Sequence, residues 1–219
     1  MDGSVRIGIL GTGVVGQTIG GKLVELGHDV KLGSRTATNE KAAKWVAQNG
    51  ARAGQGTFAD AASFGEMVFN CTSGTVSLEA LRSAGSTNLA GKVLVDVANP
   101  LDFSRGMPPT LSVSNSDSLG EQIQREFPDA KVVKTLNTMN AGVMVDPSSV
   151  PGEHDVFICG SDVDAKSRVS ELLRSFGWRS IIDLGDISAA RGAEMVLPIW
   201  LRLMATLKTA TFNFHIARG

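Results

Sequence analysis

The sequence lacks tyrosine and contains only three histidines, His28, His154 and His215. Without a phenol, the Tyr/Lys acid–base pair of short-chain dehydrogenases is excluded, and histidine-centred catalysis has few candidates. We expect His28 and His154 to be structural, whereas His215 has no apparent partner. The two cysteines, Cys71 and Cys159, belong to no Cys-x-x-Cys pair, so we expect buried, unreactive thiols and no metal site.

An excess of charge of one sign and long apolar runs are also missing. The chain has 21 Lys and Arg against 22 Asp and Glu, which leaves no basic field to hold nucleic acid. The N-terminus has no signal-peptide pattern, and the apolar stretch 195–207 is too short to span a bilayer. These features predict a cytoplasmic protein with neither nucleic acid nor a membrane as a partner.

Short apolar runs alternate with amphipathic segments along most of the chain. In the first amphipathic segment Val15, Ile19, Leu23 and Leu26 share one helical face, and Gly27 is placed to end the helix. This alternation predicts an α/β fold, a doubly wound Rossmann-type parallel sheet covered by helices on both faces. We expect strands at 5–10, 30–32, 51–53, 67–71, 93–97, 132–136, 156–159 and 181–184, and later helices at 39–50, 78–83, 119–127 and 165–176.

The first expected strand runs into a G-x-G-x-x-G sequence that also opens the first helix. In this pattern the first glycine permits a tight turn, the second lets a pyrophosphate approach the backbone, and the third allows helix and strand to pack closely. The phosphates would contact free N–H groups at the start of the helix. The sequence therefore predicts a dinucleotide site formed by Gly11, Thr12, Gly13, Val14, Val15 and Gly16.

The end of the second strand favours NADP(H) over NAD(H). NAD sites usually place an acidic residue there, but this sequence has Gly33, Ser34, Arg35 and Thr36. The Arg35 guanidinium can bind a 2′-phosphate in a bidentate manner, and the Ser34 and Thr36 hydroxyls add donors. The alternative is that Arg35 only begins a solvated loop.

Three further strand ends carry polar groups, where ligands of open α/β sheets bind. We assign Cys71 and Thr72 to the cofactor side. The nicotinamide and its acceptor are expected near Asn99, Pro100, Asn137 and Thr138, because amide side chains can bind a carboxamide. Turn and loop roles for these residues are the alternative, and no catalytic residue is firmly assigned. The lack of a strong general acid disfavours ketone reduction and fits hydride transfer between two ring systems.

Several segments together resemble the deazaflavin (coenzyme F-420)-dependent NADP oxidoreductase family: GILGTGVVG, LGSRT, VANPL, KVVKTLNTMNAG, DVFICGSD and EMVLPI. The ferric-reductase domains of metazoan membrane reductases are similar. The resemblance implies hydride exchange between NADP(H) and the deazaflavin F-420, with Thr12, Ser34 and Arg35 holding the nucleotide. It also implies an acceptor held between the sheet and a C-terminal element, in a subunit that is often dimeric. Family members that use the deazaflavin tend to have His and Pro in the segment that reads LNTMNAG in this sequence. Because both residues are missing here, a flavin is an alternative acceptor.

These observations predict a two-part subunit and leave three hypotheses for its function. We expect an NADP-binding Rossmann domain over 1–185 and a C-terminal helical element over 186–219, one helical stretch through which a homodimer forms. Residues 103–118 are expected to form a long irregular loop. The leading hypothesis is an NADP(H)-dependent oxidoreductase acting on a small conjugated redox acceptor. The alternatives are a non-catalytic NADP(H) sensor and an imine or hydroxy-acid reductase.

Overall fold

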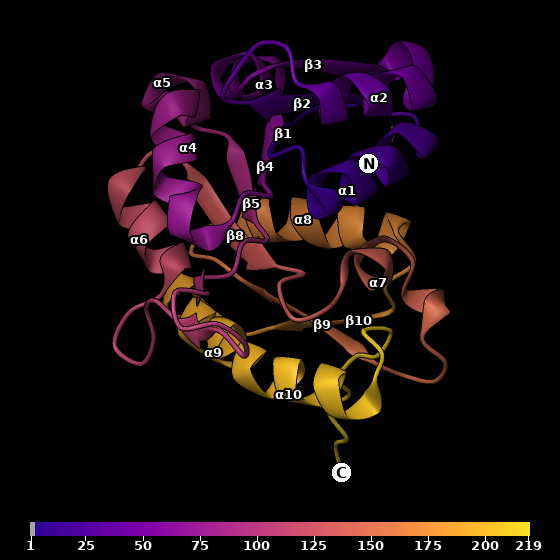
Figure 1. Ribbon diagram of the computed structural model, residues 1–219, viewed down its shortest axis with the longest axis vertical. Helices are drawn as coiled ribbons and strands as arrows, with labels where there is room; N and C mark the ends of the chain where they lie inside the picture. The colour runs from indigo at the N-terminus through magenta and orange to yellow at the C-terminus, as the bar shows by residue number, and fades with distance from the viewer. Residues whose placement is uncertain (1–2) are drawn as a thin grey trace.

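The computed structural model describes residues 3–219 and shows a sheet with helices on both faces (Figure 1). The main sheet has eight strands in the order β10-β9-β8-β5-β4-β1-β2-β3. The predicted α/β, Rossmann-type fold class is confirmed. The strands are β1 (Arg6–Leu10), β2 (Asp29–Ser34), β3 (Ala53–Thr57), β4 (Met67–Asn70), β5 (Val93–Asp96), β8 (Lys131–Thr135), β9 (Asp155–Cys159) and β10 (Ser180–Asp183).

Capping residues mark several of the helix ends. Gly27, with φ of +89°, follows the first helix as predicted, and the Asn39 side chain accepts a hydrogen bond from the Ala42 N–H (3.1 Å) to cap the second. The helices are α1 (Val14–Glu25), α2 (Glu40–Asn49), α3 (Phe58–Phe64), α4 (Ser77–Ala84), α5 (Ser86–Leu89), α6 (Leu119–Glu126), α7 (Ala141–Val145), α8 (Val163–Ser175), α9 (Ala190–Met195) and α10 (Leu197–Leu207). Short 3-10 turns lie at Gly50–Arg52, Gly74–Val76, Pro147–Ser149 and Ile187–Ala189.

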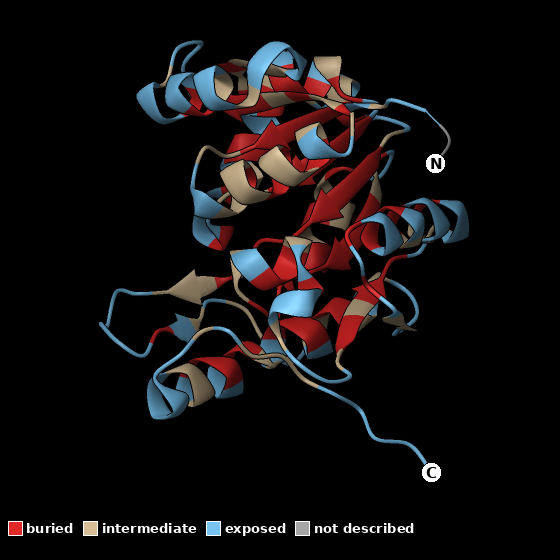
Figure 2. Cartoon of the chain, turned by 90° about the vertical axis from the view of Figure 1, so that its right-hand side faces the viewer, coloured by how far each residue is buried: buried red, intermediate tan, exposed pale blue. Residues whose placement is uncertain are grey.

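The core lies on both faces of the sheet, because successive strand residues point to opposite sides. Ile7 and Ile9 of β1 belong to a cluster with residues of α1, α2, α7 and α8, whereas Leu10 packs with residues of α3, α4 and α6. Gly8 lets α3 approach β1 closely, since a Cβ there would lie 2.1 Å from the Ala61 carbonyl oxygen. The buried residues form a continuous band through the middle of the molecule (Figure 2).

The strand order reverses between β1 and β4. The chain runs from β1 outward to β2 and β3 and then returns to β4 on the other side of β1. The carboxyl ends of β1 and β4 therefore diverge at a topological switch point, which is where open α/β sheets bind ligands.

The prediction of an entirely parallel sheet was wrong for two strands. β9 pairs with β8 in an antiparallel manner, and β10 lies parallel to β9. The reason is the connection after β8, which passes through α7 and Pro147–Ser149 and enters β9 at the same end of the sheet. No helix crosses back over the sheet between them, and an antiparallel neighbour needs none.

Two local predictions also need correction. The segment 103–118 is not wholly irregular, because β7 (Thr110–Leu111) within it forms a small antiparallel ribbon with β6 (Leu101–Asp102), which directly precedes the segment. The C-terminal region is not one helical stretch, because helix ends at Leu207 and the following segment has neither helix nor strand. It runs beside β9, where the Asp155 N–H donates to the Phe214 carbonyl (2.8 Å).

No helix among the described residues is long and apolar enough to cross a bilayer.

Candidate nucleotide-binding site

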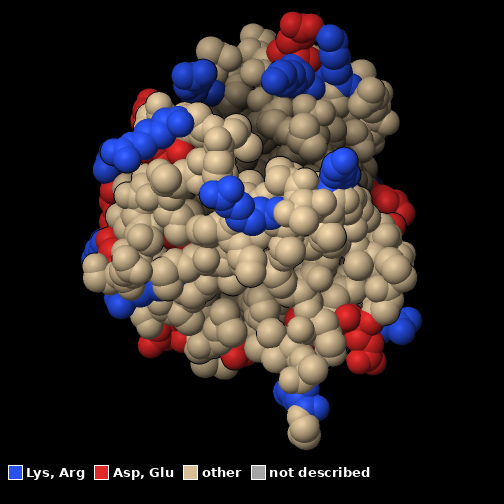
Figure 3. Space-filling model, turned by 60° about the horizontal axis from the view of Figure 1, so that its bottom comes forward, with Lys and Arg blue, Asp and Glu red and all other residues tan. Residues whose placement is uncertain are grey.

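A cavity of about 300 Å³ lies at the switch point of the sheet. The face seen in Figure 3 is hollowed below its uppermost part, with Lys and Arg side chains around the hollow. Five of the predicted cofactor residues line the cavity together: Gly11, Thr12, Ser34, Arg35 and Thr72. Gly33, beside Ser34, lines it as well, and its other lining residues, which the sequence did not indicate, are Asn39, Phe58, Val76, Glu79, Ala80 and Ser83.

The three glycines of the fingerprint have three different environments. Gly11 has φ of +120°, a conformation that favours glycine in a tight turn. A Cβ on Gly16 would lie 2.3 Å from the Gly11 carbonyl oxygen, so this glycine lets α1 pack against the turn. A Cβ on Gly13 would meet no described atom within 4 Å. The open space beside Gly13 fits the position at which a pyrophosphate would approach the backbone.

The start of α1 has free hydrogen-bond donors. Gly13 is the N-cap residue and has no side chain to cap the helix, and the first turn contains no acidic residue. The first intrahelical bond at this end runs from the Gln17 N–H to the Gly13 carbonyl (3.0 Å), and the Gln17 side chain holds the Thr12 carbonyl (2.8 Å). The N–H groups of Val14, Val15 and Gly16 therefore precede the helical ladder, an arrangement that binds anions. The Val14 side chain beside them is exposed, and that of Val15 packs partly on the core.

Arg35 is exposed at the end of β2, and within residues 3–219 its guanidinium has no hydrogen-bond or ion-pair partner. The two hydroxyls beside it are engaged with the backbone. The buried Ser34 hydroxyl donates to the Thr36 carbonyl (2.7 Å), and the Thr36 hydroxyl donates to the Thr38 carbonyl (2.8 Å). These bonds shape the loop that presents Arg35, whose guanidinium is a free donor at this end of the cavity.

Thr72 joins the cavity to a buried polar network below it. Its hydroxyl donates to Asn70 Oδ1 (2.7 Å), and the Asn70 amide donates to Ser77 Oγ (3.0 Å) and to Asp96 Oδ1 (2.8 Å). Cys71 does not line the cavity, and burial raises the pKa of its thiol. Burial also raises the pKa of Cys159 to about 12, so neither thiol is activated as a nucleophile.

The four residues predicted at the nicotinamide side lie together, but outside this cavity. Asn99 donates to the Asn137 carbonyl (2.9 Å), and the Asn137 amide donates to Asn99 Oδ1 (3.1 Å) and to the Ala193 carbonyl (3.0 Å). Pro100 and Thr138 are buried beside them. The pair thus fixes the ends of β5 and β8 against each other and against α9.

Three charged residues that the sequence reasoning did not single out lie beneath these strand ends. Lys134 is buried, and its ammonium lies 2.8 Å from Asp96 Oδ2 and 2.9 Å from Glu194 Oε1. Burial by itself lowers the pKa of Lys134, but the carboxylates of Asp96 and Glu194 outweigh it and raise that pKa above its ordinary value. A signal existed in the sequence: Lys134 and Asp96 interrupt apolar strand runs, where an unpaired charge would be costly.

Two of the three histidines have the structural roles that we expected. His28 is buried, and its Nδ1 accepts a hydrogen bond from the Val5 N–H (3.2 Å). Burial and the nearby Arg52 charge lower the pKa of His28. His154 lies between the Pro147 carbonyl (2.9 Å from Nε2) and the Asn213 amide (3.0 Å from Nδ1).

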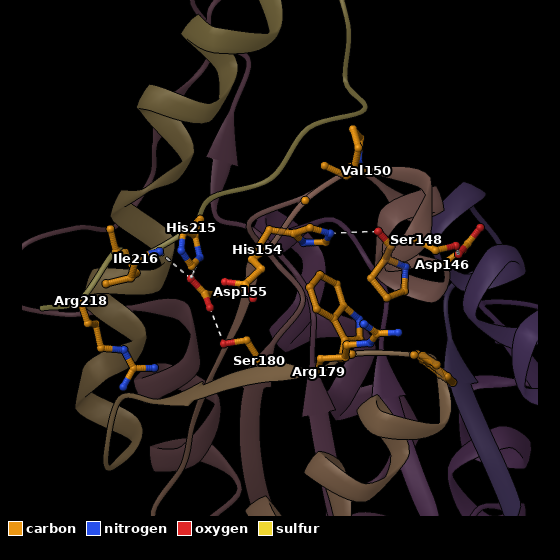
Figure 4. A pocket seen from close by; sticks show the side chains of 18 residues that line it. Asp146, Ser148, Val150, His154, Asp155, Arg179, Ser180, His215, Ile216 and Arg218 are labelled. Atoms are coloured by element: carbon orange, nitrogen blue, oxygen red, sulfur yellow. Dashed lines mark hydrogen bonds and ion pairs between the residues drawn. The ribbon is translucent and has the colours of Figure 1, made fainter.

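The prediction that His215 has no partner was wrong. Its Nδ1 lies 3.3 Å from Oδ2 of the buried Asp155, in a second hollow of about 990 Å³. Figure 4 shows Ser180 and the Ile216 N–H directed at the same carboxylate. The Asp155 carboxylate thus holds the C-terminal segment against β9 and β10. No group of three or more His, Cys, Asp or Glu side chains within residues 3–219 could hold a metal ion.

Comparisons with known proteins agree with this geometry. The family model described as coenzyme F420-dependent NADP oxidoreductase matches residues 6–100. The chain is 33% identical over 202 residues to the rat metalloreductase STEAP3. This match covers 89% of this chain but only 38% of that protein. It is 27% identical over 158 residues to the F420-dependent NADP reductase of Methanocaldococcus jannaschii, covering 72% of this chain and 70% of that protein.

A solved structure resembles the whole chain. A crystal structure from Arthrobacter sp. FB24, provisionally named an F420-dependent NADP reductase, is 54% identical to this chain. It superposes with a TM-score of 0.93 over 98% of this chain and 100% of its own. This chain therefore belongs to the family of F420-dependent NADP reductases, which are NADP-dependent oxidoreductases.

Proposed function

We propose that the protein transfers hydride between NADP(H) and a small conjugated ring acceptor, a deazaflavin such as F420 or a flavin. The observation that carries the proposal is the cavity itself. Gly11 and Thr12 of the glycine turn and the unpaired Arg35 line it, and the uncapped start of α1 follows Thr12 directly in the chain. These are the groups that a pyrophosphate and a 2′-phosphate need, and no carboxylate stands at the end of β2 to repel the 2′-phosphate.

The residues present fit the coenzyme. Gly13 leaves open the space that a Cβ would fill, and Val14, Val15 and Gly16 offer N–H groups toward it. Thr12, Ser34 and Arg35 line the cavity and would surround the nucleotide, with Arg35 supplying the charge-assisted bonds. When bound, the coenzyme would supply the hydride.

The residues on the acceptor side are held in fixed positions and can orient a bound ring. Asn99 and Asn137 are locked in reciprocal hydrogen bonds, and their neighbours Pro100 and Thr138 are buried. Neither thiol is activated, and His28 is buried and bonded to the backbone. Catalysis through orientation of two rings, with the proton furnished by solvent, requires no general acid from the protein. The names of the similar proteins support F420 as the acceptor.

The cofactor assignment is tested by Arg35→Ala. Losing charge-assisted hydrogen bonds should weaken NADPH by about 1.5–3 kcal/mol while leaving NADH nearly unchanged. Isothermal titration calorimetry with both coenzymes measures this difference. The exposed Arg174 on α8 provides the matched control, because Arg174→Ala removes the same charge from a residue that does not line the cavity. Equal losses for NADPH and NADH would refute the 2′-phosphate assignment.

The acceptor is tested by a stopped-flow screen. Oxidation of NADPH is followed after mixing with F420, FMN, FAD, a quinone or a ferric chelate. Fast oxidation by F420 or a flavin supports the proposed reaction. If no acceptor speeds oxidation although NADPH binds, the chain acts as an NADP(H) sensor instead.

We also propose that the chain divides functionally at 185/186 and forms a homodimer through its C-terminal element. Four large apolar side chains of this element are exposed: Met195, Ile199, Leu207 and Ile216. Sedimentation of the wild type against Ile199→Glu and Leu207→Glu tests this proposal. A monomeric wild type would contradict it.

A further inference from the structure

The buried charges beneath β5 and β8 are more than the fold requires. Asp96, Lys134 and Glu194 are each at most 1% exposed. Desolvating such ions costs several kcal/mol, and replacing a buried ion pair by well-packed apolar residues is often neutral or stabilising. Stability is therefore a weak reason for this cluster, and its contacts suggest another.

The first of these contacts fixes the loop that carries Asn99. Besides its two carboxylates, the Lys134 ammonium donates to the Ala98 carbonyl (2.5 Å), so each of its three hydrogens has an acceptor. The Ala98 N–H in turn donates to Asp96 Oδ1 (3.2 Å). The peptide groups on both sides of Ala98 are thereby held directly before Asn99.

The second contact ties the same ammonium to the C-terminal element. The Glu194 carboxylate also accepts from the N–H groups of Leu119 (2.9 Å) and Gly120 (3.1 Å) at the start of α6. The carbonyl of the preceding residue, Ala193, accepts from the Asn137 amide. Figure 1 shows α9 beside α6, where this element meets the strand ends.

At its other end the network reaches the nucleotide cavity. Asp96 accepts from Asn70, and Asn70 accepts from the hydroxyl of Thr72, which lines the cavity. A continuous series of hydrogen bonds thus runs from α9 through β8, β5 and β4 to the edge of the cavity.

We propose that Glu194 and Lys134 are positioning residues, which hold the Asn99–Asn137 pair in place for the nicotinamide end of the coenzyme. This inference rests on the proposed function. Arg35, at the adenosine end, forms no contact with the network. The role therefore predicts a split, in which loss of Glu194 loosens the nicotinamide end and leaves the binding of the adenosine end unchanged.

The test compares Glu194→Gln with a matched control at the same helix–helix interface. Glu121 of α6 is also buried and binds Arg191 of α9 through two hydrogen bonds (2.8 and 2.5 Å), but it does not touch Lys134. Glu121→Gln thus weakens the packing of α9 on α6 without altering the network. Two probes are titrated into each protein: adenosine 2′,5′-bisphosphate, which has only the adenosine end, and NADPH, whose nicotinamide fluorescence anisotropy is also recorded.

We expect the bisphosphate to bind all three proteins with affinities within about twofold of one another. In Glu194→Gln the NADPH affinity should fall about tenfold, and the anisotropy of bound NADPH should fall with it. Glu121→Gln should match the wild type in both. If Glu194→Gln does not fold, Glu194→Asp, which keeps the charge but shortens the side chain, is measured in the same way.

Two outcomes would overturn the inference alone. One is wild-type NADPH affinity and anisotropy in the Glu194 variant, and the other is an equal loss in Glu121→Gln. Failure of the bisphosphate to bind the wild type would instead refute the proposed function, and the inference with it.

Discussion

The two helices α1 and α6 begin at the same sheet but satisfy their first turns in opposite ways. The start of α1 has a glycine N-cap and no acidic residue, and Gly11 and Thr12 just before it line the cavity. At the start of α6, the Ser118 hydroxyl accepts from the Glu121 N–H (3.1 Å), and the Glu194 carboxylate accepts from the N–H groups of Leu119 and Gly120. Both ends carry the partial positive charge of a helix N-terminus.

This comparison shows how one physical property serves two purposes. At α6 the protein supplies its own anion, so the helix end becomes a structural joint between the sheet and the C-terminal element. At α1 the chain supplies none, so the same donors are left for the phosphates of a ligand. Single substitutions can fill or empty either of these two helix ends.

The largest effect is expected when the α6 site is emptied. Glu194→Ala removes a buried carboxylate, leaves two N–H groups unpaired and takes one acceptor from Lys134. We expect a loss of about 3–5 kcal/mol in unfolding free energy, measured by urea denaturation. Glu40→Ala is the control, because Glu40 lies in the first turn of α2 in an exposed pair with Lys44 and should cost at most about 1 kcal/mol. Similar losses in both variants would contradict this account of the α6 site.

A smaller effect, on binding rather than stability, is expected when the α1 site is blocked. Gly13→Val adds a side chain where the protein has no neighbouring atom. The unfolding temperature should therefore stay near that of the wild type, while NADPH affinity falls at least about a hundredfold, or about 2.8 kcal/mol. Gly16→Val should do the reverse and destabilise the fold, since its Cβ meets the Gly11 carbonyl. Normal NADPH binding by Gly13→Val would rule out a pyrophosphate at this turn.

A modest effect is expected when the α1 site receives a protein anion, as α6 does. Val14 is 75% exposed in the first turn, so Val14→Glu places a carboxylate there without disturbing the core. The variant should be more stable by about 0.3–1 kcal/mol and bind NADPH more weakly. Thermal unfolding with and without NADPH measures both changes. Val163→Glu, at an equally exposed first-turn position of α8, is the control for the added charge, and it should leave NADPH affinity unchanged.

The smallest effect expected at neutral pH is the pH dependence of the unfolding free energy that comes from Lys134. Although burial opposes it, the carboxylates of Asp96 and Glu194 raise the pKa of Lys134 in the folded protein. Its contribution to stability is therefore complete below the unfolded value of about 10.5 and is lost as the pH rises through the folded value. Urea denaturation from pH 9 to 11.5 should show a steeper fall for the wild type than for Glu194→Gln. Parallel curves would show that Glu194 does not stabilise the charged form of Lys134.

Features that depend on neighbouring residues were predicted well. The turn at Gly11, the open position at Gly13 and the close packing at Gly16 follow from spacing within one strand–helix unit, and the structure has all three. The capping of α2 by Asn39 was equally local. The cap of α8 is local in the same way, because the Asp162 side chain accepts from the Ala165 N–H (2.8 Å).

Features that depend on long-range pairing were not predictable in the same way. The antiparallel direction of β9 depends on which strand end the chain returns to, and no periodicity within a strand encodes that choice. The partner of His215 is Asp155, sixty residues away in sequence, and nothing near His215 indicates it.

The sequence by itself determined the dinucleotide fingerprint, the exposed Arg35 and the alternation that builds the sheet, because each of these rests on backbone freedom or periodicity within a few residues. Only the tertiary structure decided that Asp96, Lys134 and Glu194 meet in one buried cluster. The physical reason is that a charge in an apolar run shows that a partner must exist, since burying it alone is too costly, but gives no sign of where in the chain that partner lies.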